Sequence, residues 1–355
     1  MAHETLFNKA LSDWMRESGP DRDIVFSSRI RLARNLGSQP FPMLATNQQS
    51  AEVLEQVSSV LSNKELESLG NFRLIGLKDL NELQKRVLVE KHLISPNLAN
   101  ESRNGAVILS DNESFSIMVN EEDHLRIQCL RPGFQIREAW ELADRIDNIF
   151  ESELEFAFDE KRGYLTSCPT NVGTGLRASV MMHLPALVIT QQINRLLSAI
   201  TQVGLAVRGL YGEGSEAMGN LFQISNQITL GQSEEEILDN LYRVAKQIIA
   251  HERTARQKLL AESKTRLIDR VNRSYGILCN AYIIDSKEAA QRLSDVRLGM
   301  DLGLINTKAT PEITDELIVM TQPGFLQQLA GGKLSSDERD VQRAELIRRK
   351  LGSNK

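Results

Sequence analysis

The spacing of apolar residues predicts a first part of the chain in which helices and strands are mixed. Three apolar runs between residues 105 and 131 are separated by short polar turns, a pattern typical of an antiparallel β-meander. Residues 156–167 predict a hairpin whose turn spans Asp159 to Gly163. Apolar positions three and four residues apart predict helices over residues 3–18, 47–69, 79–93, 135–153 and 189–202, and a further helix that begins at Leu176.

After Gln232 the pattern becomes helical and stays so. It predicts helices over residues 233–262, 264–278, 286–302, 312–319 and about 336–351. No internal repeat and no low-complexity linker interrupts the chain, so we expect two closely packed domains, 1–255 and 256–355. The predicted fold class is α+β, an antiparallel β-sheet flanked by helices, followed by an all-helical C-terminal domain.

Composition excludes several classes of protein. The 355 residues carry a net charge of −5, which argues against a nucleic-acid binder that works through a general basic field. No apolar run is long enough to cross a bilayer, and the first residues lack the order of a signal peptide, so we expect a cytoplasmic protein without membrane association. Three widely spaced cysteines predict free thiols and no zinc site or other metal site.

A glycine-rich stretch, Ser167 to Pro185, is the first candidate for chemistry. Gly173 and Gly175 permit a positive φ, and the helix expected from Leu176 would present unpaired N–H groups and a positive dipole end to an anion. Arg177 on its first turn would add a full charge, and Cys168 beside it would have a lowered pKa. Taken alone, the pattern fits a plain tight turn equally well.

Charged residues mark two further segments. Arg29 and Arg31 are two apart in an extended segment, residues 24–36, so both project from one face and match a polyphosphate. An exposed basic strand edge is the alternative. Residues 120–126, NEEDHLR, place three carboxylates in a row, which by themselves would more often be a solvated hairpin tip. The glycine-rich middle of residues 204–231 carries Glu213, and either a closing active-site loop or a long hairpin loop would fit it.

These segments together resemble the phosphagen (guanidino) kinases. The matching stretches are CPTN with a Gly-Thr pair and LRAS, then SSRIR, NEEDHLR, RGxxGE and ISN. Neither a GxxxxGK[ST] loop nor the HRD and DFG motifs of protein kinases occur in the chain. The resemblance implies a guanidino kinase or glutamine synthetase-like catalytic domain that uses ATP and Mg²⁺.

The resemblance also implies the site residues. Glu122 and Glu213 would hold and deprotonate the acceptor guanidinium, Glu121 would orient it, and Cys168 would lie against it as a thiolate. The nucleotide-binding residues that it implies are Ser27, Ser28, Arg29, Ile30, Arg31, His92, Arg126, Arg177, Ala178, Ser179, Val180, Met181, Arg208, Gly209, Leu210, Tyr211, Gly212 and Glu213.

Two features point to a protein acceptor. Members of the family that act on small molecules carry a helical domain of about a hundred residues ahead of SSRIR, where this chain has 26, so we expect a more open site. RDVQRA, Arg339 to Ala344, is similar to a signature for phosphoarginine bound at an allosteric site, which would involve Arg339, Asp340, Arg343 and Ala344. A solvated helix face is the alternative for this last motif.

The resemblance implies a kinase of protein arginines that marks its substrates for degradation. The implied partners are proteins with exposed arginines, among them a heat-shock repressor and misfolded proteins, together with a zinc-binding activator protein and a Clp ATPase and protease. A homodimer or higher oligomer is expected, with no direct contact to nucleic acid. Two alternatives stay open, a kinase of free arginine or another small guanidino compound, and a non-catalytic adaptor that binds phosphoarginine.

Overall fold

The computed structural model describes residues 6–7, 9, 11–209, 218–307 and 309–352. The strands are β1 (Val25–Arg34), β2 (Phe72–Gly76), β3 (Ala106–Ser110), β4 (Phe115–Val119), β5 (Leu125–Pro132), β6 (Phe158–Asp159), β7 (Gly163–Tyr164), β8 (Leu176–His183), β9 (Leu205–Gly209) and β10 (Leu221–Asn226). The α-helices are α2 (Asp13–Arg16), α3 (Asn47–Ser59), α4 (Lys64–Ser68), α5 (Glu82–Glu90), α6 (Pro96–Glu101), α7 (Ile136–Glu153), α8 (Pro185–Ile189), α9 (Ile193–Gln202), α10 (Glu234–Glu262), α11 (Lys264–Asn280), α12 (Ser286–Asp301), α13 (Pro311–Met320), α14 (Pro323–Ala330) and α15 (Ser336–Leu351). Short 3-10 turns cover Val60–Ser62, Leu77–Asp79, Pro169–Asn171 and Met218–Asn220.

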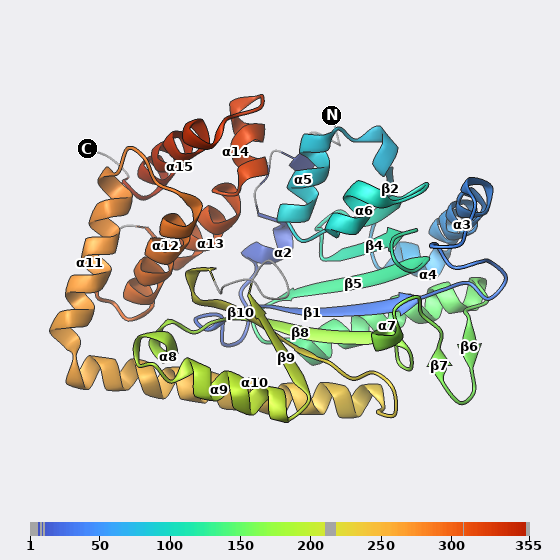
Figure 1. Ribbon diagram of the computed structural model, residues 1–355, viewed down its shortest axis with the longest axis horizontal. Coiled ribbons are helices and arrows are strands. Elements are labelled where there is room, and N and C mark those ends of the chain that lie inside the picture. Colours follow the sequence, from blue (N-terminus) through green and yellow to red (C-terminus); the bar gives the residue numbers. More distant parts are fainter. Residues whose placement is uncertain (1–5, 8, 10, 210–217, 308, 353–355) are drawn as a thin grey trace.

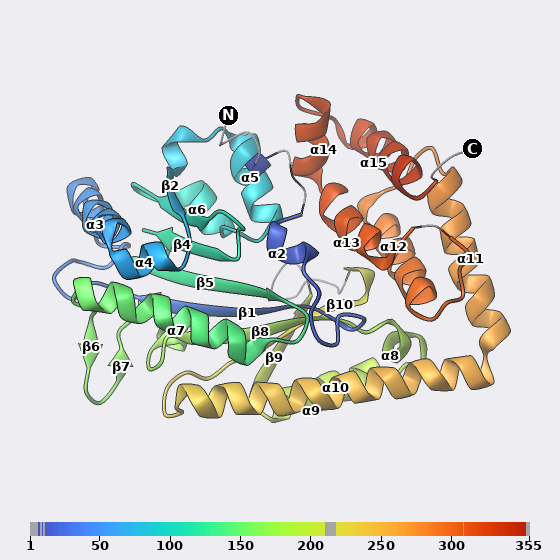
Figure 2. The ribbon, with the colours of Figure 1, turned by 180° about the vertical axis from the view of Figure 1, so that it is seen from behind.

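An antiparallel sheet of eight strands forms the centre of the molecule (Figures 1 and 2). Its strand order is β2-β3-β4-β5-β1-β8-β10-β9, so β1 from near the start of the chain lies between β5 and β8. The register places Arg29 opposite Ser179 and Arg31 opposite Arg177 on neighbouring strands. Because side chains alternate across a strand, this register gathers polar side chains of β1 and β8 on one face.

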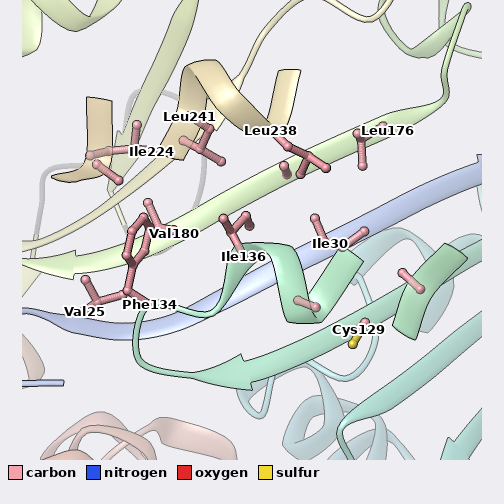
Figure 3. Packing of buried hydrophobic residues seen from close by; sticks show 14 of the residues in the cluster. Val25, Ile30, Cys129, Phe134, Ile136, Leu176, Val180, Ile224, Leu238 and Leu241 are labelled. Atoms are coloured by element: carbon pink, nitrogen blue, oxygen red, sulfur yellow. The ribbon is translucent and has the colours of Figure 1, made fainter. Parts of the chain in front are cut away.

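The opposite face of the sheet carries the larger hydrophobic core. Helices α7 and α10 cover this face, and Figure 3 shows Ile30, Val180 and Ile224 from the strands facing Ile136 of α7 and Leu241 of α10. α7 is apolar along one side, which is the pattern that lets a helix pack on a sheet. Burial of these aliphatic side chains fixes the orientation of the strands and leaves the polar face available.

A second hydrophobic core joins the C-terminal helices to the sheet. It combines Val87 of α5 and Val107 of β3 with Val296 of α12, Phe325 of α14 and Ile347 of α15, all of them buried. The C-terminal helices therefore share a core with the first part of the chain. α10 continues through residue 255, the predicted domain boundary, and the chain turns only at Ser263, where α11 begins.

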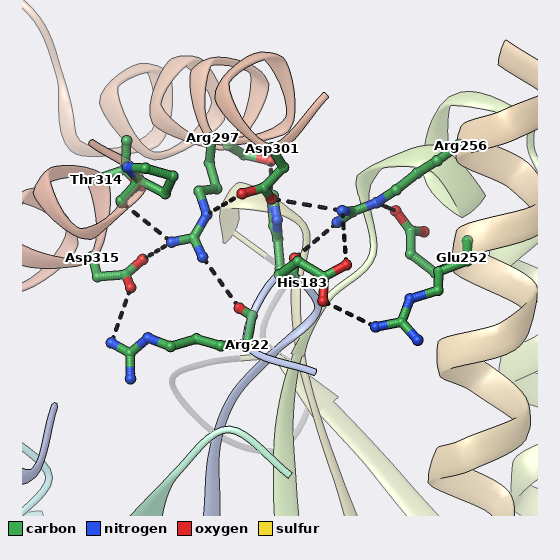
Figure 4. A network of polar contacts seen from close by, with 12 residues as sticks. Arg22, His183, Glu252, Arg256, Arg297, Asp301, Thr314 and Asp315 are labelled. Carbon is green, nitrogen blue, oxygen red and sulfur yellow. Dashed lines mark hydrogen bonds and ion pairs between the residues drawn. The ribbon is translucent and has the colours of Figure 1, made fainter. Parts of the chain in front are cut away.

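A buried polar network also links the C-terminal helices to the first part of the chain (Figure 4). Arg297 of α12 bonds Asp315 of α13, donates from Nε to Asp301 at 3.0 Å and donates from Nη2 to the carbonyl of Arg22 at 3.1 Å. Arg256 of α10 lies 3.6 Å from Asp301. Buried charges are tolerated where they are paired in this way, so the network holds the N-terminal segment, α10, α12 and α13 together.

Most of the predicted elements are present, with several differences, and β2 and α6 are elements that were not predicted. The predicted helix from Leu176 is wrong, because residues 176–183 form strand β8. Apolar residues four apart fit a strand as well as a helix, since four is a multiple of two. Residues 47–69 form two helices that break at Asn63, which caps the second helix. Within the predicted helix over 3–18 the longest described helical run is α2, and α14 was not predicted.

Candidate functional site

The polar face of β1 and β8 lines a cleft. One cavity of about 480 Å³ is bordered by Arg29, Arg31 and Arg208, and an adjoining cavity of about 410 Å³ is bordered by Arg31, Arg208 and Cys168. Arg126 borders both cavities, so they form one continuous site. Volumes of this size are typical of pockets for small ligands.

Five arginines gather in the cleft, and their charges repel one another. Burial, together with the charges of Arg126 and Arg177, lowers the pKa of Arg29 to about 10. Burial lowers the pKa of Arg31 well below its usual value, and the neighbouring Arg29, Arg126, Arg177 and Arg208 add to that shift. Among the described residues, no hydrogen-bond partner reaches the buried Nε of Arg31. Such a cluster of positive charges attracts an anion of several charges.

The acidic turn lies at one end of this cluster. Arg126 donates from Nη1 to Glu121 at 2.9 Å and from Nη2 to Glu122 at 3.1 Å. Ser95 donates a further hydrogen bond to Glu121 at 2.6 Å, whereas Glu122 borders the smaller cavity beside Cys168. Glu121 is therefore tied to its protein partners, and Glu122 is the carboxylate that a ligand in the cleft can reach.

The carboxyl of Glu122 is electrostatically perturbed by its surroundings. Burial raises the pKa of its carboxyl, Asp123 and Glu121 raise it further, and Arg126 and a hydrogen bond with Cys168 oppose the rise. The Cys168 sulfur also lies 3.1 Å from the Thr170 hydroxyl. A raised pKa makes a carboxylate a stronger base than an exposed glutamate.

Asp123 is a buried residue of the site that the sequence did not single out. Its Oδ1 accepts hydrogen bonds from the amide of Asn35 at 2.6 Å and from the backbone N–H of Ser167 at 2.7 Å. Asn35 in turn accepts from the N–H of His124 at 2.9 Å. These bonds tie the acidic turn to the segment that carries Cys168, and the only signal in the sequence was its place in a run of acids.

His92 borders the larger cavity at the end of α5. Its backbone has a φ of 59° and its carbonyl accepts a hydrogen bond from the Gln128 side chain at 2.8 Å. Burial, with a smaller contribution from the charge of Arg29, lowers the pKa of His92 to about 4. The ring is therefore neutral at physiological pH and can accept or donate a hydrogen bond.

The structure separates the predicted nucleotide-binding residues into several groups. Those that border the two cavities are Arg29, Arg31, His92, Arg126, Arg177, Arg208 and Gly209, whereas Ser27, Ser179 and Met181 border a smaller neighbouring cavity of about 80 Å³. The side chains of Ile30, Ala178 and Val180 lie in the core on the other face of the sheet, and Ser28 is buried against Gly133 and Gln135. Leu210, Tyr211, Gly212 and Glu213 lie outside the described residues.

The glycine-rich turn has the predicted backbone but feeds a strand. Gly173 and Gly175 both have a positive φ, and a Cβ at Gly175 would lie 2.6 Å from the Ala33 carbonyl oxygen of β1. Glycine is thus needed where the turn meets the sheet. Because β8 follows, the predicted helix N-terminus for an anion is absent at Leu176, and positive charge comes from Arg177 on the strand.

The chain is similar to two described protein families. Residues 52–255 match the description "ATP:guanido phosphotransferase, C-terminal catalytic domain", and residues 264–355 match "Protein-arginine kinase McsB C-terminal domain". Over 351 residues the chain is 60% identical to a protein-arginine kinase of Brevibacillus brevis, covering 99% of this chain and 98% of that one. It is 61% identical to a protein-arginine kinase of Halalkalibacterium halodurans, with the same coverage. The chain belongs to the protein-arginine kinase family.

Solved structures of guanidino kinases share the fold of this family member. A duplicated taurocyamine kinase from Schistosoma mansoni superposes with a TM-score of 0.60 at 24% identity, covering 67% of this chain and 34% of that one. A lombricine kinase superposes with a TM-score of 0.58 at 23% identity, covering 70% and 77%. The predicted antiparallel sheet flanked by helices, with a helical C-terminal part, is thereby confirmed, as is a phosphotransferase class of enzyme.

The site fits the nucleotide of an ATP:guanido phosphotransferase. The arginine cluster matches a polyphosphate in charge and in its supply of N–H donors. No group of three or more His, Cys, Asp and Glu side chains is arranged for a metal ion in the part of the chain that the structure describes. In kinases Mg²⁺ commonly binds through the phosphate oxygens of the nucleotide with one or two carboxylates. Nor does any helix in that part have the length and apolar character that crossing a membrane requires.

The motif of the C-terminal protein-arginine kinase domain lies on α15, and its residues differ in their surroundings. Arg343 is buried and donates to the carbonyls of Thr321 at 3.0 Å and Ile284 at 2.9 Å, and it also bonds Asp340. Ala344 lies in the second core, and Arg339 donates to the carbonyl of Leu334 at 2.9 Å. The motif thus links helices through a buried arginine. Neither the allosteric site nor the solvated helix face considered from the sequence included that role.

Proposed function

We propose that this chain transfers the γ-phosphoryl group of ATP to arginine side chains of proteins. The observation that carries the proposal is that Glu122 and Cys168 border the same cavity as Arg31, Arg126, Arg177 and Arg208. A carboxylate beside a polycationic cluster suits a reaction in which a guanidinium meets a triphosphate. The names of the relatives, protein-arginine kinases that match over almost the whole chain, support the choice of acceptor.

The reaction requires the acceptor to lose a proton. A guanidinium is protonated at cellular pH and has no free lone pair with which to attack phosphorus. In the proposed step Glu122 takes a proton from the guanidinium, a new N–P bond forms, and the bond between the γ-phosphorus and the bridging oxygen of ADP breaks. Glu213 is the proposed second carboxylate, and it lies outside the described residues. Asp123 is the proposed positioning residue for the segment that carries Cys168, through its bond to Ser167.

The arginines act on the other reactant. They neutralise the charge of the triphosphate together with Mg²⁺ and stabilise the charge that moves to ADP as the bond breaks. Arg29 is held by a hydrogen bond from its Nη2 to Gln223 at 2.6 Å. A guanidinium held in place in this way contributes to the rate mainly by aligning the triphosphate, and alignment can supply effective molarities of about 10⁵ M or more.

The cellular role is part of the proposal. We infer that phosphorylation marks misfolded proteins and a heat-shock repressor for a Clp ATPase and protease in the cytoplasm as part of a stress response. A zinc-binding activator protein and assembly into a homodimer or higher oligomer belong to the same proposal. The inference is supported by the full-length similarity to protein-arginine kinases.

Regulation by phosphoarginine at Arg339, Asp340, Arg343 and Ala344 is also proposed. The match of residues 264–355 to the protein-arginine kinase C-terminal domain supports it. Arg339 is the partly exposed cation of the motif, with its Nη1 on the Leu334 carbonyl, so it is the proposed contact for an incoming phosphoryl group. Arg343 and Ala344 would act by holding α15 in place.

One labelling experiment tests the function. The chain is incubated with ATP radiolabelled at the γ-phosphate, Mg²⁺ and an arginine-rich protein, with free arginine in a parallel reaction. We expect label on the protein that is lost in acid and retained in alkali, as a phosphorus–nitrogen bond requires. Label on free arginine alone would favour a kinase of small guanidino compounds, and no transfer to either acceptor would favour a phosphoarginine-binding adaptor.

A further inference from the structure

The cleft has two distinct ends along β1. Glu122 and Cys168 lie at one end, next to Arg31 and Arg177. At the other end the larger cavity is bordered by Arg29, His92 and two residues of the C-terminal helical part, Gln322 and Pro323. If the γ-phosphate lies beside Glu122 and the arginines hold the chain of phosphates, the nucleoside extends toward Gln322.

Gln322 borders three cavities, and their volumes indicate which of them can hold a base. A small, mainly apolar cavity bordered by Trp14, Ile318 and Gln322 measures about 80 Å³, which is too little for a nucleoside. The cavity of about 480 Å³ is large enough and also includes Gln322. Gln322 therefore faces the space in which a base would lie, and it comes from the turn between α13 and α14.

Gln322 keeps part of its hydrogen-bonding capacity for a ligand. Its Nε2 donates to the carbonyl of Ile318 at 2.8 Å, which fixes which end of the amide is the oxygen. The acceptor Oε1 and the second N–H of the same amide remain. Together they match the N6 donor and the N7 acceptor of adenine, whereas guanine presents two acceptors, O6 and N7, on that edge.

The turn that carries Gln322 is held from both sides. Glu90, at the end of α5, accepts from the N–H of Gly324 at 2.7 Å and of Phe325 at 2.9 Å. A Cβ on Gly324 would lie 2.7 Å from the Glu90 carboxylate, so the residue type permits this approach. On the other side Arg343 donates to the carbonyl of Thr321 at 3.0 Å. A side chain on so fixed a turn can discriminate between ligands.

We propose that Gln322 reads the nucleobase, so that the C-terminal helical domain supplies a specificity-determining residue of the nucleotide pocket. The inference rests on the proposed function, because it takes the ligand of the arginine cluster to be a nucleoside triphosphate. Residues 264–355 match a domain description of their own, which means that the base-reading residue belongs to the protein-arginine kinase part of the chain. Glu90 and Arg343 are positioning residues for Gln322.

Calorimetric titration of the full chain with ATP and with GTP, each with Mg²⁺, tests the inference. Gln322→Ala should weaken ATP binding about three- to tenfold, the loss expected for one neutral hydrogen bond, and leave GTP binding unchanged. The matched control is Gln328→Ala, since Gln328 lies on α14 and borders none of these cavities. Unchanged ATP binding in Gln322→Ala, or an equal loss for ATP and GTP, would overturn the proposal.

A second measurement uses the unaltered chain and so does not depend on a variant that folds. Amide hydrogen exchange in residues 320–326 should slow when ATP is added and stay unchanged with inorganic tripolyphosphate, which lacks a base. Equal exchange with and without ATP would contradict a base at Gln322. Neither measurement uses phosphoryl transfer, so a chain that binds ATP through Gln322 but labels no arginine would refute the proposed function and leave this inference standing.

Discussion

Arg126 joins the two glutamates of the acidic turn, with Nη1 2.9 Å from Glu121 and Nη2 3.1 Å from Glu122. The two carboxylates are not equivalent, because the Glu121 side chain is 2% exposed and that of Glu122 is 33% exposed. An arriving guanidinium can replace one contact at Glu122 without disturbing Glu121. The proposed function therefore gives binding and proton transfer to Glu122, while Glu121 contacts Arg126.

Replacing Glu122 with Gln should remove phosphoryl transfer and spare nucleotide binding. The amide keeps the size of the side chain but cannot take a proton, and a positioned general base contributes about 10²–10⁴-fold to the rate. Steady-state rates with an arginine-rich protein and calorimetry with ATP give both quantities. Glu160→Gln, in the exposed turn of the β6–β7 hairpin, is the control. Loss of ATP binding in Glu122→Gln would contradict the assigned role.

The pH dependence of the reaction should reflect the protonation of the Glu122 carboxyl. Burial raises the pKa of Glu122, so on acidification this group takes up its proton at a higher pH than an exposed glutamate does. Only the deprotonated form can act as base, and kcat/KM should therefore fall as the pH is lowered through that raised pKa. A pH profile measured down to pH 5 checks this. His92 has a pKa of about 4 and should add no inflection between pH 6 and 8.

The cysteines should react with alkylating agents in a fixed order. Cys168 is partly exposed in the cleft, whereas Cys129 is fully buried in the core and burial raises its pKa to about 12. At pH 8 a thiol with that pKa is ionised in about one molecule in 10⁴. Iodoacetamide should thus label Cys168 and leave Cys129 unmodified, as peptide mass spectrometry can show. Labelling of Cys129 at a comparable rate would mean that the core opens under the conditions of the assay.

Asp123 should matter more for the rate than for nucleotide binding. Asp123→Ala leaves the Asn35 amide and the Ser167 N–H without their shared acceptor, at a cost of about 2–4 kcal/mol for two hydrogen bonds to a charged group in a buried place. The segment that carries Cys168 then loses its link to the acidic turn. We expect a lower kcat, a lower thermal midpoint and little change in the Kd for ATP.

The control for Asp123 is a carboxylate with a similar number of bonds in an exposed turn. Asp159→Ala removes acceptors for the N–H groups of Lys161 and Arg162 within the β6–β7 hairpin, away from the cleft. It should leave kcat unchanged. If Asp123→Ala lowers stability but not kcat, then Asp123 supports the fold alone.

Local patterns in the sequence were enough to predict much of the fold and the arginines of β1 in the site. The meander over residues 105–131 and the last helix were predictable because short-range periodicity and capping determine them, as the Ser335 and Glu338 capping box shows for α15. Arg29 and Arg31 share a face because they are two apart on a strand. The spacing of apolar residues led to the wrong assignment of residues 176–183 as a helix, because that spacing fits the period of a helix and the period of a strand.

The other half of the site depends on contacts between distant residues. Asp123 looked like one more acid at a hairpin tip, and its role follows only from Asn35 and Ser167 packing beside it. Gln322 gave no signal at all. It reaches the cleft because Glu90 binds Gly324, a contact between residues 234 positions apart. Neither periodicity nor a motif contains information about such a pair.

Replacing Arg343 should destabilise the fold, because this side chain is buried, unlike that of a regulatory residue on the surface. Its side chain is 2% exposed, and it satisfies two backbone carbonyls and the Asp340 carboxylate. Arg343→Ala would leave these acceptors buried without a donor, which costs about 3 kcal/mol or more. Arg339→Ala removes one bond to a carbonyl at the partly exposed start of α15 and should cost about 1 kcal/mol or less.

Thermal unfolding of the two single variants separates structure from regulation. Arg343→Ala should lower the midpoint strongly and, since Thr321 precedes Gln322, should also weaken ATP binding. Arg339→Ala should keep the midpoint and the basal rate, and alter only the response to added phosphoarginine. Equal midpoints for the two variants would show that the bonds of Arg343 contribute little to stability. A loss of ATP binding in Arg339→Ala would place that residue in the support of the nucleotide pocket as well.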